Sequence, residues 1–118
     1  MKHNFRNMKI WQLGMDLLVD VYALTKKLPN EEKFGLVSQM NRCAVSIPSN
    51  IAEGSGRSTN KDFASFLHIS LGSVYELETQ IIASYRLKYI SNEEHESIIF
   101  KIVDLEKMIK AFINSLNS

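Results

Sequence analysis

The sequence predicts an all-α protein, an antiparallel up-down-up-down four-helix bundle with long helices. The 118 residues include only 5 glycines and 2 prolines, which favours long helices over many turns. Apolar residues recur at spacings of three and four, as on one face of a helix, and do not alternate as in strands. Stop and capping residues divide the chain into helices at about 8–28, 31–54, 60–88 and 92–116.

The first two helices are separated by a proline and an acidic segment. Pro29 ends the first helix, because the residue before a proline disfavours helical geometry. Asn30 is predicted to cap the second helix, with Glu31 and Glu32 in its first turn near the positive end of the helix dipole. The run Gly54-Ser55-Gly56 is predicted to stop this helix.

The last two helices begin with capping signals. Thr59 and Asp62 resemble a capping box, and Ser91 with Glu94 makes a full one. Connections this short predict antiparallel neighbours. The predicted core stripes are Ile10, Leu17, Val21, Leu24 and Leu28; Leu36, Met40, Ala44, Ile47 and Ile51; Phe63, Leu67, Ser70, Val74, Leu77 and Ile81; and Ile98, Ile102, Leu105, Ile109, Phe112 and Leu116.

Composition indicates one domain that spans residues 1–118. Hydrophobic residues make up 45% and charged residues 23%, which is typical of a globular chain. The single cysteine excludes an internal disulfide and favours a cytoplasmic location. We find no signal-peptide pattern and no apolar run long enough for a membrane span, so no membrane partner is expected. The formal net charge of +1 gives no strong nucleic-acid signature.

The predicted helices carry more apolar surface than a lone bundle can bury. The first helix has a second apolar stripe, and residues 43–52 and 63–75 contain no charged side chain. Such patches are uncommon on monomers, so we predict a homo-oligomer that associates through the first three helices. The alternative is that serine, asparagine, histidine and glutamine make these faces polar enough. The predicted interface residues are Trp11, Met15, Leu18, Tyr22, Val45, Phe66 and Ile69.

A line of polar residues flanks the core stripe of the second helix. We predict that it forms an ordered hydrogen-bonded network at a bundle or subunit seam, and a ligand-binding site is the alternative. The residues of this line are Gln39, Arg42, Ser46, Asn50 and Glu53.

The sequence predicts no catalytic, cofactor or metal site. A di-iron bundle needs Glu-x-x-His twice, and the motif does not occur. Cys43 lies in an apolar helical stretch and is predicted to be a packing residue rather than a nucleophile. His68 is predicted to be a hydrogen-bonded buried or interface histidine, and His95 to be solvated.

A loop rich in glycine and polar residues at 54–61 leads into the third helix. A helix N-terminus with nearby cations can bind phosphate, so Arg57 and Lys61, together with Arg42, are candidate nucleic-acid contacts. The loop does not match the phosphate-binding motif G-x-x-x-x-G-K-[ST]. A helix stop followed by an N-cap explains the same residues.

Most of the chain, from Trp11 to Ile90, resembles a known family. The resemblance is carried by Leu28-Pro29-Asn30-Glu31-Glu32 and, above all, by Ser46-Ile47-Pro48-Ser49-Asn50-Ile51-Ala52-Glu53-Gly54, followed by Gly72-Ser73-Val74-Tyr75-Glu76-Leu77. This pattern closely resembles the bacterial four-helix-bundle family named for 23S rRNA intervening sequences, also labelled S23 ribosomal protein.

The resemblance implies an antiparallel bundle that assembles into a ring-like homopentamer, with no established catalytic activity. It also relates the chain to the accessory variability protein of diversity-generating retroelements, a basic pentamer that works with a reverse transcriptase and nucleic acid. We therefore expect a non-enzymatic, homopentameric scaffold or partner-binding module. The alternative is an accessory protein that binds RNA or DNA.

Overall fold

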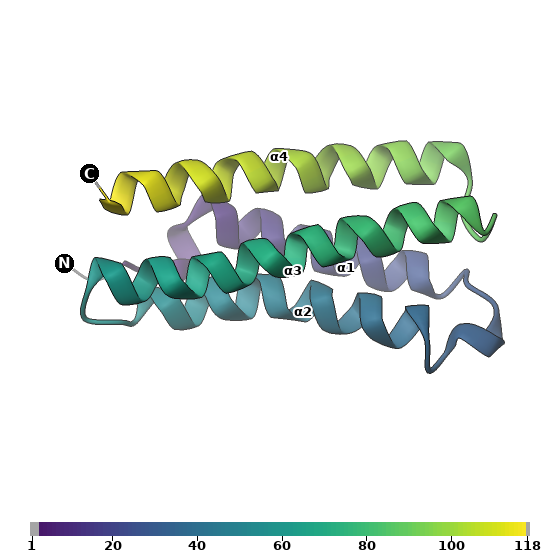
Figure 1. Ribbon diagram of the computed structural model, residues 1–118, viewed down its shortest axis with the longest axis horizontal. Helices are drawn as coiled ribbons and strands as arrows, with labels where there is room; N and C mark the ends of the chain where they lie inside the picture. Colours follow the sequence, from purple (N-terminus) through teal and green to yellow (C-terminus); the bar gives the residue numbers. More distant parts are fainter. Residues whose placement is uncertain (1–2, 118) are drawn as a thin grey trace.

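The computed structural model describes residues 3–117 as an elongated bundle of 46 × 24 × 20 Å (Figure 1). Its long helices run back and forth, so both chain ends lie at the same end of the bundle. Within the described residues there is no strand, and the predicted all-α fold class is confirmed. The helices are η1 (Phe5–Asn7), α1 (Lys9–Thr25), η2 (Asn30–Glu32), α2 (Leu36–Ser55), α3 (Asn60–Arg86) and α4 (Asn92–Asn117).

The long helices pack in a closed order in which each contacts its two neighbours. The α2–α3 contact is the most extensive and the α1–α4 contact the least. The α1–α4 seam is bridged by two ion pairs, Lys101 with Asp20 at 2.5 Å and Lys27 with Glu94. Asp20 of α1 and Lys27, just after its end, are therefore on the side of the first helix that faces α4.

The predicted core stripes meet along the bundle axis. Almost all of their residues are buried, and Val21, Met40 and Leu67 are fully excluded from solvent. Leu36, Phe112 and Leu116 are only partly buried but still pack against the core. These three residues lie within the first or last two turns of their helices, where fewer neighbours cover them.

The connection from α1 to α2 differs from the prediction. Residues 30–32 form the short helix η2, and α2 begins at Leu36 rather than near residue 31. Asn30 does not cap α2. The Glu32 side chain takes that role, because its Oε1 accepts the backbone N–H of Leu36 at 3.1 Å. The Tyr89 hydroxyl donates to Oε2 of the same carboxylate at 3.1 Å, which ties this connection to the one between α3 and α4.

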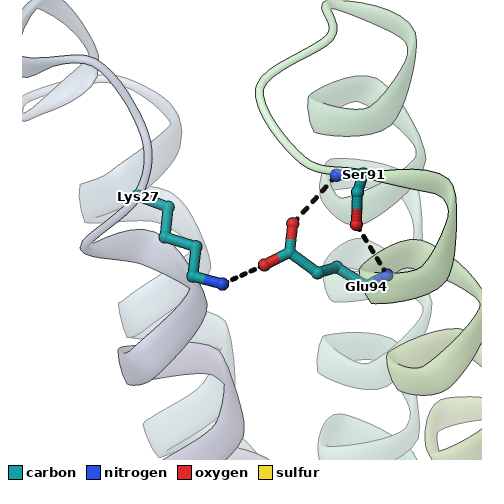
Figure 2. Close-up of polar contacts among 3 residues, drawn as sticks. All are labelled: Lys27, Ser91 and Glu94. Carbon is teal, nitrogen blue, oxygen red and sulfur yellow. Dashed lines mark hydrogen bonds and ion pairs between the residues drawn. The ribbon is translucent and has the colours of Figure 1, made fainter.

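The predicted starts of α3 and α4 are confirmed. Thr59 accepts the backbone N–H of Asp62 at 3.1 Å. Ser91 and Glu94 form the reciprocal capping box: the Ser91 hydroxyl accepts the Glu94 N–H at 3.1 Å, and the Glu94 carboxylate accepts the Ser91 N–H at 2.9 Å (Figure 2). The free oxygen of Glu94 contacts Lys27, so the same side chain caps α4 and joins it to the end of α1.

Gly54 allows α2 and α3 to approach closely. A Cβ atom at this position would lie 2.8 Å from Cβ of Phe66 and 2.9 Å from Cδ1 of Phe63. The helix continues past Gly54 to Ser55, and no described glycine has a positive φ. Gly54 therefore serves close packing, and only Gly56 of the predicted stop sequence stands at the helix end.

Candidate interaction surface

The predicted interface residues lie on three adjacent helices. Trp11, Met15, Leu18 and Tyr22 belong to α1, Val45 to α2, and Phe66 and Ile69 to α3. Because α2 contacts both α1 and α3, it lies between the predicted interface residues of α1 and those of α3. Met15, Tyr22, Val45 and Ile69 are exposed, and the other three are half-buried.

A groove of about 660 Å³ runs between α1 and the start of α2. Tyr22 and Val45 both line it, so the structure brings together two of the predicted interface residues from different helices. Its other lining residues are Lys33, Phe34, Val37, Ser38, Asn41, Arg42, Ser46 and Ser49. Its apolar lining comes from Tyr22 on α1, from Phe34 before α2, and from Val37 and Val45 on α2, and Lys33 and Arg42 supply two cations.

Phe34 stands beside this groove with its side chain 90% exposed, more than any other large apolar side chain described. The sequence does not predict its exposure, because residues 31–36 are expected to form the first turns of a helix. The signal was an aromatic residue directly after Glu31, Glu32 and Lys33, in a segment with no apolar periodicity. Val19 and Phe100, at 62% and 75% exposed, were also missed.

The predicted polar line of α2 divides into three parts. Ser46 and Asn50 form a network with α3: the Ser46 and Ser73 hydroxyls are 2.8 Å apart, and the Asn50 amide donates to Ser46 Oγ and to its backbone oxygen at 2.9 Å. Glu53 instead pairs with Arg57 at 2.8 Å. Gln39 and Arg42 line a small hollow of about 220 Å³ with Cys43, Ser46, Ser73 and Glu76.

Cys43 packs at the α2–α3 seam, as expected. Its thiol is buried, and the Gln80 amide donates to Sγ at 3.6 Å. Burial raises the pKa of the Cys43 thiol, and the hydrogen bond from Gln80 only partly opposes this. A thiol with a raised pKa is a poor nucleophile at neutral pH.

The two helical histidines differ from expectation. His68 is exposed in the single chain, so the buried assignment is wrong and a subunit interface remains the prediction. His95 is half-buried rather than solvated, and its ring stacks on Tyr85 with centroids 4.4 Å apart and planes inclined by 19°. His95 lies on the side of α4 that faces α3, which its place in the first turn did not reveal.

The three candidate nucleic-acid contacts do not form one patch. Arg57 and Lys61 flank the start of α3, whereas Arg42 lies more than three turns back along α2, roughly 20 Å away. The guanidinium of Arg57 lies over the Phe66 ring at 4.5 Å and also pairs with Glu53. Glu53 therefore offsets part of the positive charge of this loop.

Within residues 3–117, no group of three or more histidine, cysteine, aspartate or glutamate side chains is arranged to hold a metal ion. The helices of this part of the chain also fall short of the length and apolar character that a bilayer span requires.

The structure defines an all-α antiparallel bundle that exposes large apolar side chains on α1, α2 and α3, and Phe100 on α4. A family model described as 23S rRNA-intervening sequence protein matches residues 6–111, and the chain belongs to this family. It is similar to a crystal structure of a protein with unknown function from the S23 ribosomal protein family of Bacteroides thetaiotaomicron. The two are 30% identical, the match covers 88% of this chain and 97% of that one, and the TM-score is 0.82. No curated protein matches the chain.

Proposed function

We propose that the chain is the subunit of a ring-like homopentamer that acts in the cytoplasm as a non-enzymatic scaffold or partner-binding module. The observation that carries the proposal is the exposed apolar surface across α1, α2 and α3. When a second subunit covers apolar side chains that are exposed to water in the single chain, the free energy of the system falls, which favours association.

The position of this surface supports a ring more than a two-fold dimer. A ring forms when each subunit presents two different patches that meet heterologously. The chain has apolar residues on its α1–α2 side, namely Tyr22 and Val45, and others on its α2–α3 side, namely Phe66 and Ile69. Two neighbouring sides of a four-cornered bundle face different directions, so contacts through both can close into a ring, and the number five rests on the family resemblance alone.

Charged substitutions in the groove test the proposal. Tyr22→Glu and Val45→Glu each place a carboxylate where a subunit contact would have to desolvate it, and a buried unpaired charge is strongly unfavourable. We expect both variants to sediment at a lower mass than the wild type at micromolar concentration. Circular dichroism reports whether each subunit keeps its helices.

Phe100→Glu provides the matched control. It adds the same charge at an apolar side chain that is 75% exposed, but on α4, outside the proposed surface. We expect Phe100→Glu to sediment like the wild type. Loss of assembly in Phe100→Glu with intact assembly in Tyr22→Glu would place the interface on α4 and contradict the proposed surface.

The second candidate is an accessory protein that binds RNA or DNA. The observation that favours it is the pair Arg57 and Lys61, both exposed beside the Thr59-capped start of α3. Five copies in a ring would repeat this pair around one rim. Filter binding of single-stranded RNA at low and high salt tests it: affinity that falls steeply with salt and weakens in Arg57→Gln/Lys61→Gln supports phosphate contacts, whereas no binding at low salt contradicts them.

A further inference from the structure

Two carboxyl groups meet where α3 and α4 pack together. Glu106 of α4 is only 9% exposed and follows the buried core residue Leu105. Glu78 of α3 is half-buried, and its carboxyl group hydrogen-bonds to that of Glu106. Glu106 is the one charged side chain among the buried residues described, so the interior holds an acidic group with no opposite charge beside it in the core.

The hydrogen bonding of this pair requires a proton. The second oxygen of Glu106, Oε2, is buried and has no hydrogen-bond partner within the described chain. An ionised carboxylate can only accept hydrogen bonds, so two carboxylates can bond to each other only when one of them carries a proton. If both groups were ionised, they would also repel each other in a place from which water is largely excluded.

No neighbouring cation within the described residues neutralises the carboxyl pair well enough to make that proton unnecessary. Lys110, one turn further along α4, favours the charged form of Glu106. Its ammonium group is also held by Tyr75 of α3, 5.4 Å from the ring centroid, and this contact raises the pKa of Lys110. On the α1 side of α4, Asp20 and Lys101 already pair with each other at 2.5 Å. Burial and the carboxyl group of Glu78 dominate, and together they raise the pKa of Glu106 from 4.5 to about 7.

We propose that Glu78 and Glu106 form a proton-binding site, and that the shared proton holds the α3–α4 seam closed. When the proton leaves, two carboxylates face each other across the seam, one of them buried. Because α4 contacts α3 more extensively than it contacts α1, loss of this seam loosens α4 from the bundle. The ligand of the site is therefore a proton, and the site makes the stability of the fold depend on pH near neutrality.

The sign of this dependence follows from the direction of the shift. The folded chain holds the proton up to about pH 7, whereas in the unfolded chain the pKa of Glu106 is near 4.5. Stability is therefore highest at acidic pH, falls as the pH rises between these values, and reaches its lower level above pH 7. Between pH 5.5 and pH 8 the unfolding constant is expected to increase about 30-fold through this group.

Urea unfolding at pH 5.5 and pH 8, at one protein concentration, tests the proposal. Other groups also change charge in this range, so the test is the difference between wild type and variants. We expect Glu106→Gln to remove most of the increase, because it removes the titrating group. Glu78→Gln is expected to reduce the increase without abolishing it, because the burial of Glu106, the largest cause of its raised pKa, remains. Asp104→Asn, an exposed carboxylate on the outer face of the same helix, is expected to keep the wild-type dependence.

A second measurement does not depend on the variants folding. In wild-type protein labelled with ¹³C at the glutamate carboxyl carbons, one resonance is expected to titrate near pH 7, well above the others. The resonance is expected to be absent from Glu106→Gln and to move to lower pH in Glu78→Gln. The proposal is overturned if all glutamate resonances of the wild type titrate below about pH 5.5, or if Glu106→Gln keeps the wild-type dependence of unfolding on pH.

Discussion

At the scale of single residues, Lys88 holds an unusual backbone conformation. Its φ is 66°, the one positive value among the described non-glycine residues. Lys88 follows the end of α3, where its N–H donates to the Tyr85 oxygen and the Tyr89 N–H donates to the Ser84 oxygen, both at 2.9 Å. This is the Schellman arrangement, in which glycine is the usual residue at the left-handed position.

Replacing Lys88 with glycine is expected to stabilise the protein by about 0.5–1 kcal/mol, because glycine adopts this conformation without the Cβ clash. Lys88→Ala is the matched control, since it removes the charge but keeps the Cβ atom. Urea unfolding at a fixed protein concentration measures both. Equal stability of the glycine and alanine variants would contradict the argument from backbone conformation.

Two glycines allow a contrasting test of close packing. Gly54→Ala is expected to destabilise the protein by about 1–3 kcal/mol, because the new methyl group meets Phe63 and Phe66 below 3 Å. Gly72→Ala is expected to stabilise it by up to ~1 kcal/mol, because nothing lies within 4 Å and alanine favours the helix. Thermal unfolding by circular dichroism distinguishes the two. Opposite shifts are predicted, and a loss of stability in both variants would contradict the packing account.

At the scale of the helices, local signals in the sequence predicted the elements that depend on them. The Ser91–Glu94 capping box and the Thr59 cap are local patterns, and both helices begin where these patterns stand. The start of α2 was not predictable in this way. Its cap, Glu32, is held by Tyr89 from 57 residues further along the chain, and a contact of this kind leaves no local pattern.

The surface features that follow from the periodicity of one helix were predictable, and those that depend on contacts between helices were not. The second apolar stripe of α1 follows from helical periodicity, and its residues do lie on one side of the helix. The division of the α2 polar line was not predictable, because it depends on which α3 residue stands opposite. Ser73 hydrogen-bonds to Ser46, whereas Glu53 forms an ion pair with Arg57 and does not join this network. The pair of Glu78 and Glu106 was not predictable either, because helical periodicity does not show which residues of α3 and α4 come together.

Two variants distinguish how much the cap of α4 and the ion pair between Glu94 and Lys27 each stabilise the protein. Ser91→Ala removes the side chain that accepts the Glu94 N–H and is expected to cost about 1 kcal/mol. Glu94→Gln keeps an oxygen for the Ser91 N–H but loses the attraction to Lys27, so it is expected to cost less, about 0.5 kcal/mol. Urea unfolding of both variants measures the order. A larger loss in Glu94→Gln would show that the ion pair, rather than the cap, stabilises this end of α4.

The ion pair also gives a pH dependence at the acidic end. The hydrogen bond from Lys27, together with the Ser91 N–H, holds the pKa of Glu94 below its usual 4.5. A lowered pKa in the folded state adds stability above pH 4.5, and this stability is lost as the pH falls through the folded pKa. Lys27→Met is expected to reduce the loss of stability between pH 5 and pH 3. An unchanged acid dependence in Lys27→Met would contradict the role of this pair.

At the scale of the whole molecule, the bundle has a closed hydrophobic core, but large apolar side chains remain exposed on its surface. Its interior is closed by four helices, whereas apolar side chains on α1, α2 and α3 remain in contact with water. We infer that a second copy of the chain covers them. The excess apolar residues of the sequence and the groove between α1 and α2 support it.

The mass of the wild-type protein in solution tests this claim most directly. One chain has a mass of 13.5 kDa, and native mass spectrometry at micromolar concentration is expected to show a ring of five chains at about 68 kDa. Tyr22→Glu measured beside it is expected to shift toward the single chain. A wild-type protein that remains at 13.5 kDa at this concentration would contradict the account.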